Sequence, residues 1–171
     1  MSENEQRSQF ERLVIPHLDA AYNLARWLAG NDHDAEDIAQ EACMRAFRFV
    51  GRCRGSDGRA WLLAIVRNTA WSWLKKNRSH ALVSIDDDEF GELEDPCGAA
   101  SSFHSADAEA LRAALQALPV EFREALVLRE LEGLSYKEIA DVAEVPVGTV
   151  MSRLARARRQ LQGALNGKEK A

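Results

Sequence analysis

The feature that most constrains the fold of this chain is a stretch near its middle that has no basic residue. Residues 79–110 carry nine Asp and Glu and no Lys or Arg, whereas the segments on either side of them are each net positive. Such an acidic stretch, interspersed with Gly and Ser, favours a flexible connector over a buried element. This stretch divides the chain of 171 residues into two segments, and each of them is near the lower size limit of an independent domain. The sequence therefore predicts two small domains, residues 1–78 and 107–171, joined by an acidic flexible linker, residues 79–106.

The basic residues of the two flanking segments are themselves concentrated. Residues 45–78 hold nine bases against Asp57 alone, and residues 145–168 hold five bases and no acid. Two basic surfaces on two small domains indicate two contacts with nucleic acid. The alternative for each surface is a solvated helix face.

Apolar residues recur at helical spacing in both segments, and no run alternates apolar and polar residues as a strand would. The sequence therefore predicts an all-α protein. In the first segment we expect helices from Leu18 to Leu28 with a stop at Gly30, from an N-cap at Asp34 to Phe49, and from Arg59 to Lys76. A basic loop, residues 50–58, separates the last two, and Phe49 is expected to point into the core.

In the second segment, Ser135 and Glu138 have the spacing of a capping box, which predicts a short helix that ends at the turn 144–146. A longer basic helix follows, with Val147 on its core face. Two further helices are expected before the capping box, one ended by Pro119 and one ending near residue 133. Two helices joined by a tight turn, the second of them basic, predict a helix-turn-helix.

One face of that last helix suits the major groove of duplex DNA. The N-terminal part of a recognition helix enters the groove deepest, and Arg, Ser and Thr side chains can bond base edges or phosphates. We therefore assign the reading of duplex DNA to Thr149, Ser152, Arg153 and Arg156.

The predicted helix 59–76 offers a different surface opposite its core stripe, next to the basic loop. Its members are basic or polar residues around one Trp: Arg52, Arg54, Arg59, Arg67, Asn68, Trp71 and Lys75. An exposed Trp between basic residues is expected where unpaired bases are held by stacking. Because Trp is usually largely buried, packing of Trp71 against a neighbouring helix is the alternative.

Acidic residues gather at the start of the predicted helix 34–49. They complement the helix dipole, and Glu41 can pair with Arg45 one turn later. Asp37 and Glu41, however, are like charges one turn apart, which destabilises an isolated helix and indicates a basic protein partner.

The reactive residues of the chain form no catalytic or metal-binding pattern. Cys43, Cys53 and Cys97 lack a C-x-x-C pairing, the four His lack ligand spacing, and there is no Gly-rich phosphate loop. We expect reduced thiols, no metal, no cofactor and no enzymatic activity; oxidation sensing through Cys43 or Cys53 is the alternative.

The longest apolar run, Ala60 to Val66, is far too short for a membrane helix, and the N-terminal residues are unlike a signal peptide. The sequence therefore predicts no membrane insertion and a cytoplasmic location.

Three segments of the chain strongly resemble the bacterial extracytoplasmic-function (ECF) sigma factors. They are DAEDIAQEACMRAFRF at 34–49, RAWLLAIVRNTAWSWLKK at 59–76, and the run 118–161 that contains the predicted helix-turn-helix. The resemblance covers residues 10–78 and 107–165 in the family's order.

The resemblance implies a two-domain initiation factor of RNA polymerase. Residues up to 78 would form region 2, whose acidic helix docks on the coiled coil of the polymerase β′ subunit through Asp34, Glu36, Asp37, Gln40 and Glu41. The basic loop and the helix after it would melt promoter DNA and bind the −10 element as a single strand. Residues 107–171 would form region 4, which reads the −35 element through the helix from Val147 and contacts the polymerase β flap.

The family also implies an anti-sigma factor as a regulatory partner and a place for the acidic linker in the RNA-exit path. At three positions this chain departs from the family: Met151 stands where Lys or Arg is common, Ser72 replaces a frequent Asp, and Glu144 takes a turn position usually held by Gly. A left-handed Glu144 would cost about 1 kcal/mol. These departures concern the promoter sequence and not the class of protein.

The alternative to a sigma factor is an autonomous helix-turn-helix regulator of transcription. Such a protein would need a dimerisation helix or a ligand pocket, and the sequence shows neither.

Overall fold

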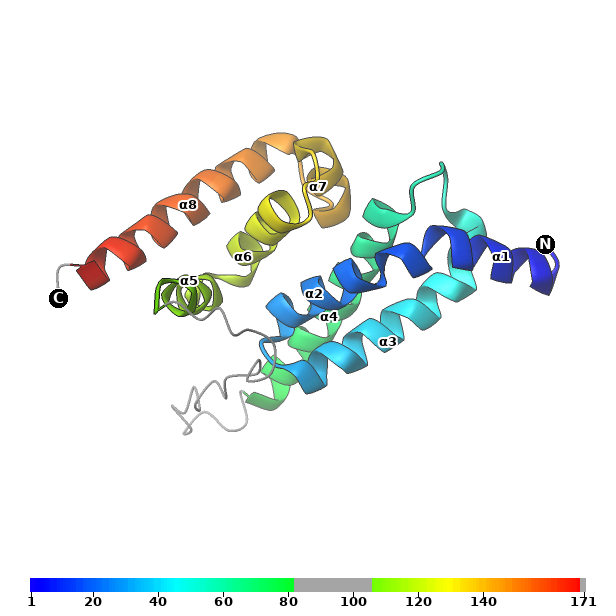
Figure 1. The fold of residues 1–171 in the computed structure, drawn as a ribbon, viewed down its shortest axis with the longest axis horizontal. Helices are drawn as coiled ribbons and strands as arrows, with labels where there is room; N and C mark the ends of the chain where they lie inside the picture. The colour runs from blue at the N-terminus through cyan, green and yellow to red at the C-terminus, as the bar shows by residue number, and fades with distance from the viewer. Residues whose placement is uncertain (82–105, 170–171) are drawn as a thin grey trace. The chain divides into compact units, whose positions relative to one another are not determined.

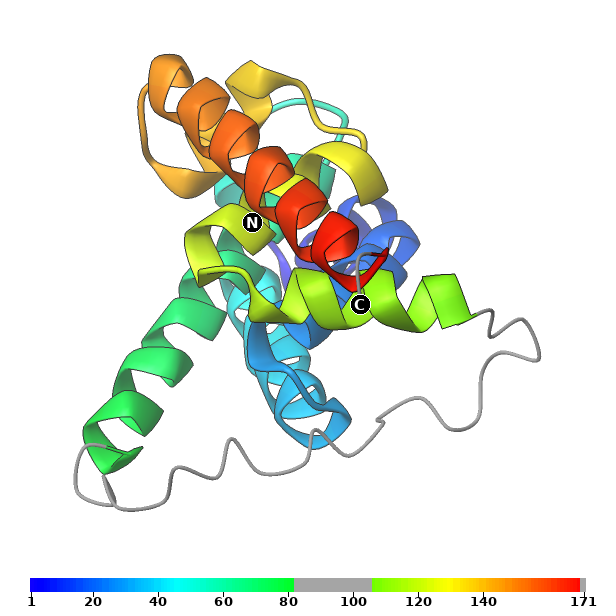
Figure 2. The ribbon, with the colours of Figure 1, turned by 90° about the vertical axis from the view of Figure 1, so that its left-hand side faces the viewer.

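The computed structural model describes residues 1–81 and 106–169. Within these ranges the chain forms helices and turns and no strand, which confirms the prediction of an all-α protein (Figures 1 and 2). The described helices belong to two compact units, the first containing residues 1–81 and the second residues 106–140 and 144–169. Almost all of the predicted linker, with Cys97 and His104, lies outside the described residues.

The first unit consists of α1 (Glu3–Leu13), α2 (Leu18–Ala29), α3 (Asp32–Phe49) and α4 (Arg59–Ala81). Helices α2, α3 and α4 pack on one another in all three combinations. Their core holds Leu24, Leu28, Ile38, Leu62 and Leu63, all fully buried, surrounded by buried alanines that let the helices approach closely.

Helix α1 is not among the predicted helices, because Leu13 is its one buried residue and its apolar pattern is weak. It begins at a capping box: the Glu5 amide donates to Ser2 Oγ (3.3 Å) and the Ser2 amide donates to Glu5 Oε2 (2.8 Å). Tertiary contacts hold it on α3. The rings of Phe10 and Phe47 meet edge to face at 5.3 Å, and Gln6 Nε2 donates to the Phe47 carbonyl (2.8 Å).

The start and the end of α3 differ from the sequence-based expectation. Its N-cap is Asn31 and not Asp34: Gly30 ends α2 in the left-handed region (φ 89°), and the Asn31 side chain then accepts from the Asp34 amide (2.9 Å). Phe49 does not point into the core. It is the last residue of α3 and remains 38% exposed, with the Arg52 guanidinium over its ring at 5.0 Å.

The second unit consists of α5 (Ala106–Ala117), α6 (Val120–Leu126), a π-helical turn η3 (Val127–Leu131), α7 (Tyr136–Ala143) and α8 (Val147–Glu169). Both α5 and α6 pack against α8. Leu128, Leu134, Ile139 and Leu154 are the largest fully buried side chains of this unit's core, and Figure 2 shows α8 as one long uninterrupted helix.

The helix-turn-helix of the second unit is confirmed at α7 and α8. The Glu138 amide donates to Ser135 Oγ (3.1 Å) and the Ser135 amide donates to Glu138 Oε1 (3.0 Å), as a capping box requires. Helix α7 then ends at Glu144, which is left-handed (φ 56°). Val147, expected on the core face, is instead 41% exposed, because it is the first residue of α8 and the buried stripe begins one turn later at Val150.

No helix within the described ranges is both long enough and apolar enough to cross a membrane.

Candidate nucleic-acid and protein interfaces

The five residues predicted to dock on the polymerase all lie on the first turns of α3. Glu36, Asp37, Gln40 and Glu41 are exposed. Asp34 is half-buried, and its carboxylate accepts a hydrogen bond from Asn31 Nδ2 (2.6 Å). Glu41 pairs with Arg45 (2.9 Å), and Asp32, the first residue of the helix, pairs with Arg26 (2.7 Å).

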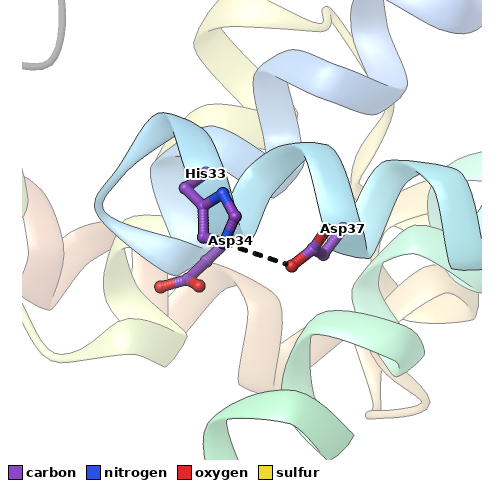
Figure 3. Close-up of side chains that lie close together, drawn as sticks. All are labelled: His33, Asp34 and Asp37. Carbon is purple, nitrogen blue, oxygen red and sulfur yellow. Dashed lines mark ion pairs between the residues drawn. The ribbon is translucent and has the colours of Figure 1, made fainter.

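His33, Asp34 and Asp37 form a cluster on this acidic surface, with ligand atoms within 4.8 Å of one another. Figure 3 shows the three side chains side by side, with the imidazole Nε2 of His33 3.8 Å from a carboxylate oxygen of Asp37. Exposed acidic groups of this kind are common without an ion, and no further observation points to one. The absence of a metal therefore stays a prediction.

An apolar groove lies beside the acidic surface, between α1 and α3. It has a volume of about 580 Å³ and is lined by Gln6, Phe10, Gln40, Cys43, Met44, Phe47 and Arg48. Met44 is 58% exposed there. The groove depends on α1, which the apolar pattern of the sequence does not predict; the Ser2–Glu5 spacing is the signal that points to that helix.

The residues predicted to bind single-stranded DNA divide between the loop after α3 and one side of α4. Arg52, Arg54, Asn68 and Lys75 are exposed, whereas Arg59, Arg67 and Trp71 are half-buried. The guanidinium of Arg67 lies 4.7 Å from the centroid of the Trp71 ring. Because Trp71 is neither fully exposed nor fully buried, base stacking and helix packing both remain open for it.

Contacts from distant parts of the first unit hold the basic loop in place. Gly58 is buried, and a Cβ at this position would overlap the carbonyl of Leu13 at the end of α1. Asp57 accepts from the Arg59 amide (3.0 Å), which caps α4, and also lies 3.5 Å from His17 Nε2. The contacts of Asp57 and Gly58 therefore fix the end of the loop that carries Arg52 and Arg54.

The residues predicted to read duplex DNA lie on the first half of α8. Ser152 and Arg156 are exposed and Thr149 and Arg153 are half-buried, while Val150 and Leu154 are buried in the unit's core. Further along, Arg158 donates to Glu130 (2.8 Å), and this hydrogen bond raises the pKa of Arg158. That exposed ion pair joins α8 to η3, while the buried stripe of Val150, Leu154 and Ala157 sets which side of α8 faces the core.

Cys43 and Cys53 are both free and half-buried. Burial raises the pKa of each thiol, and the carboxylate of Asp57 raises that of Cys53 further. Redox-sensing cysteines normally have a lowered pKa, so the environment of both residues favours inert thiols.

Comparison with known proteins gives a consistent result. The Sigma-70 region 2 model matches residues 13–80, and the Sigma-70, region 4 model matches residues 108–161. The chain is 39% identical to the ECF RNA polymerase sigma factor SigE of Mycolicibacterium smegmatis over 91% of its own length and 61% of that relative. It is 36% identical to the RNA polymerase sigma-H factor of Pseudomonas aeruginosa over 91% of this chain and 86% of the relative.

Among solved structures, the sigma factor RpoE in complex with the anti-sigma factor NepR from Bartonella quintana matches with a TM-score of 0.74 and 29% identity. The match covers 90% of this chain and 94% of that one. CnrH in complex with the cytosolic domain of CnrY, at 24% identity, covers 92% and 88% and shares the fold, with a TM-score of 0.64. From the extent and the order of these matches, the chain belongs to the ECF RNA polymerase sigma factors.

Proposed function

We propose that this protein binds core RNA polymerase and directs it to promoters by recognising −35 and −10 elements. The observation that carries the proposal is that the two units present different kinds of surface. The first presents an acidic helix face, a basic loop and, further along α4, a half-buried Trp; the second presents the polar and basic face of a helix-turn-helix. Such a factor works in the cytoplasm and without catalysis of its own.

The acidic face of α3 is the proposed contact with the β′ coiled coil. Exposed carboxylates at Glu36, Asp37 and Glu41 suit a basic partner, and all three lie within the first ten residues of α3. Region 2 would span residues 1–78.

The basic loop and α4 are the proposed contact with the −10 element. Arg52 and Arg54 can follow phosphates, and the stacked Arg67–Trp71 pair offers flat surfaces on which unpaired bases can stack. Melting of the duplex would supply those unpaired bases.

Region 4, residues 107–171, is the proposed reader of the −35 element. Arg156 and Ser152 are exposed where a recognition helix meets base edges, and Thr149 and Arg153 flank them. This unit would also contact the β flap, and the acidic linker, 79–106, would occupy the RNA-exit path.

We also propose control by an anti-sigma factor. The support is the relative RpoE, whose structure was solved in complex with the anti-sigma factor NepR and which covers nearly this whole chain.

Run-off transcription with purified core RNA polymerase on a pool of genomic promoters tests the proposal. Promoter-specific transcripts are expected only when the protein is added. Asp37→Ala should weaken binding to the core, and Arg153→Ala should lower promoter-specific transcription about tenfold without changing core binding. Asp19→Ala, a change of an exposed acid on α2, is the matched control. Tight sequence-specific DNA binding by the free protein, with no effect on the polymerase, would instead establish an autonomous regulator.

A further inference from the structure

We infer that Met151, supported by Val147, selects a thymine in the −35 element by packing against the C5-methyl group of that base in the major groove. The inference rests on the proposed function, because it concerns the helix that the proposal assigns to duplex DNA. It adds to the polar and basic reading residues an apolar contact that distinguishes one base pair at one position of the promoter.

Met151 and Val147 form an exposed apolar pair at the start of α8. Met151 is 53% exposed and Val147 is 41% exposed, although both are large apolar residues. They are four residues apart, so they are neighbours on one side of the helix. The stripe that α8 buries in the core consists of other residues, Val150, Leu154 and Ala157. The pair is therefore available to a partner without loss of the core contacts of α8.

The pair lies beside the residues already assigned to base reading. At about 100° per residue, Met151 is roughly 60° round the helix from the buried Leu154 and roughly 100° from the exposed Ser152, so it forms one flank of the exposed side. A helix with its side chains is about 10–12 Å across, and the major groove is about 12 Å wide. A recognition helix therefore fills the groove, and the flank that carries Met151 meets base edges.

The start of α8 is held where such a contact needs it. The amides of Thr149 and Val150 both donate to the carbonyl of Pro146 (3.0 and 3.2 Å), which ties the first turn of α8 to the turn after α7. Met151 is the fifth residue of α8. It therefore belongs to the N-terminal part of the helix, which enters the groove deepest.

The chemistry of this flank points to thymine. The other positions on it, Gly148 and Ala155, are small and uncharged, and a Cβ added at Gly148 would meet no atom within 4 Å. These side chains cannot donate to a phosphate or to the acceptors of guanine. The C5-methyl group of thymine is the apolar group that base pairs present in the major groove. The flexible and polarisable side chain of Met151 can adapt to it.

The first test removes the methyl group of the DNA and nothing else. Each thymine in the −35 element of a promoter found by run-off transcription is replaced in turn by deoxyuridine, which pairs as thymine does but lacks the C5-methyl group. Binding is measured with core RNA polymerase loaded with the full chain. We expect one position at which deoxyuridine weakens binding about fourfold, as the loss of one buried methyl group predicts. With Met151→Ala, thymine and deoxyuridine at that position should bind equally.

Two variants are controls for this measurement. Met151→Leu keeps an apolar side chain of similar volume and should keep the sensitivity to deoxyuridine. Leu111→Ala shortens another exposed apolar side chain of the same unit, on α5 (41% exposed), and should keep it as well. Met151→Ala should be as stable to urea as the wild type, because Met151 lies outside the buried stripe.

The second test distinguishes a contact with a base from a contact with the DNA backbone. Met151→Arg introduces the kind of residue that is common in the family at this position. In a selection of −35 elements from a randomised pool, we expect this variant to lose the preference for thymine at the sensitive position and to keep the preferences at the other positions. Tighter binding to all −35 sequences alike would show that residue 151 faces phosphates and would overturn the inference.

The outcomes separate this inference from the proposed function. Sensitivity to deoxyuridine that Met151→Ala abolishes supports it. Equal sensitivity in Met151→Ala and the wild type means that another residue contacts the methyl group. No sensitivity at any −35 thymine, or a −35 element without thymine, means that no methyl group is read. Either result, with promoter-specific transcription intact, overturns the inference and leaves the proposed function standing. If the wild type with core polymerase gives no promoter-specific transcript, both fail.

Discussion

The two units hold their predicted DNA-binding surfaces by different means. In the second unit, contacts between near neighbours set the start of α8: the Ser135–Glu138 capping box, the left-handed Glu144, and the Val145 amide that donates to the Ala140 carbonyl (3.1 Å). In the first unit, the basic loop rests on distant residues, with Gly58 against Leu13 and Asp57 near His17. A surface built locally tolerates changes elsewhere in its unit. The loop, by contrast, depends on α1 and the turn after it.

Replacing Gly58 tests this dependence most severely. In Gly58→Ala the new Cβ overlaps the Leu13 carbonyl, a backbone group that cannot rotate away, so we expect the free energy of unfolding to fall by about 3 kcal/mol. Urea unfolding measures this. Gly163→Ala in α8, where no atom lies within 4 Å of the added Cβ, is the control and should stabilise by about 0.5 kcal/mol. Equal stability of the two variants would show that the loop has room at Gly58.

Removing a cap tests the local design of the second unit. Ser135→Ala leaves the Glu138 amide without its side-chain acceptor and should lower the free energy of unfolding by about 1 kcal/mol. Ser8→Ala, on the exposed side of α1, should change it by less than about 0.5 kcal/mol. Amides of α7 and α8 should also exchange faster in Ser135→Ala than in the wild type. Equal exchange rates in the two proteins would show that the cap does not hold the turn.

The left-handed residue in the turn predicts a change of the opposite sign. Glu144→Gly removes the steric penalty of a Cβ at φ 56° and should stabilise the protein by about 0.5 kcal/mol after the larger entropy of the unfolded Gly is counted. Asp141→Gly, at an exposed position inside α7, should destabilise by about 0.5–1 kcal/mol. Thermal unfolding of the pair distinguishes turn strain from a general effect of Gly, and destabilisation by both would refute the strain.

The smallest expected effect concerns α1 and its own capping box. Hydrogen bonds from the Ser2 backbone amide and the Ser2 hydroxyl hold the pKa of Glu5 below its ordinary value of 4.5. Because the pKa of Glu5 is lower in the folded state, the ionised Glu5 carboxylate stabilises α1 fully at pH values above its ordinary pKa of 4.5. That stabilisation is lost as the pH falls through the lowered pKa. Carboxyl NMR should show Glu5 titrating at lower pH than in Ser2→Ala, and the hydrogen-exchange protection factors of the α1 amides should fall at low pH. Identical titration in the two proteins would show that the Ser2 hydroxyl does not contribute to the lowered pKa of Glu5.

The contrast between the units also explains what the sequence could predict. Capping boxes, Gly stops and the turn before α8 are signals spread over four or five residues, so α2, α7 and the start of α8 were predictable to within a residue or two. Helix α1 carried the same kind of signal at Ser2 and Glu5, but without an apolar stripe behind it the signal had little weight.

The errors at the ends of α3 have a similar cause. Asp34 and Asn31 are both good N-cap residues, and the choice between them depends on where Gly30 ends the preceding helix. Phe49 fits the helical stripe of α3, yet a stripe does not show where the neighbouring helices stop covering it. The groove beside α3 could not be predicted, since it requires the contacts of Gln6 and Phe10 with Phe47 across more than thirty residues of sequence.

Helix α1 has a further consequence for how the first unit tolerates variation. It lines the groove through Gln6 and Phe10, and its last residue, Leu13, supplies the carbonyl that lies against Gly58. These eleven residues form a rod of about 16 Å, which is stiff over such a length. A substitution that shifts α1 on α3 therefore changes two features at once: the width of the groove and the contact between Leu13 and Gly58 that positions the basic loop. Positions 10, 13, 47 and 58 are thus expected to vary together in sequence, although no single one of them contacts all the others.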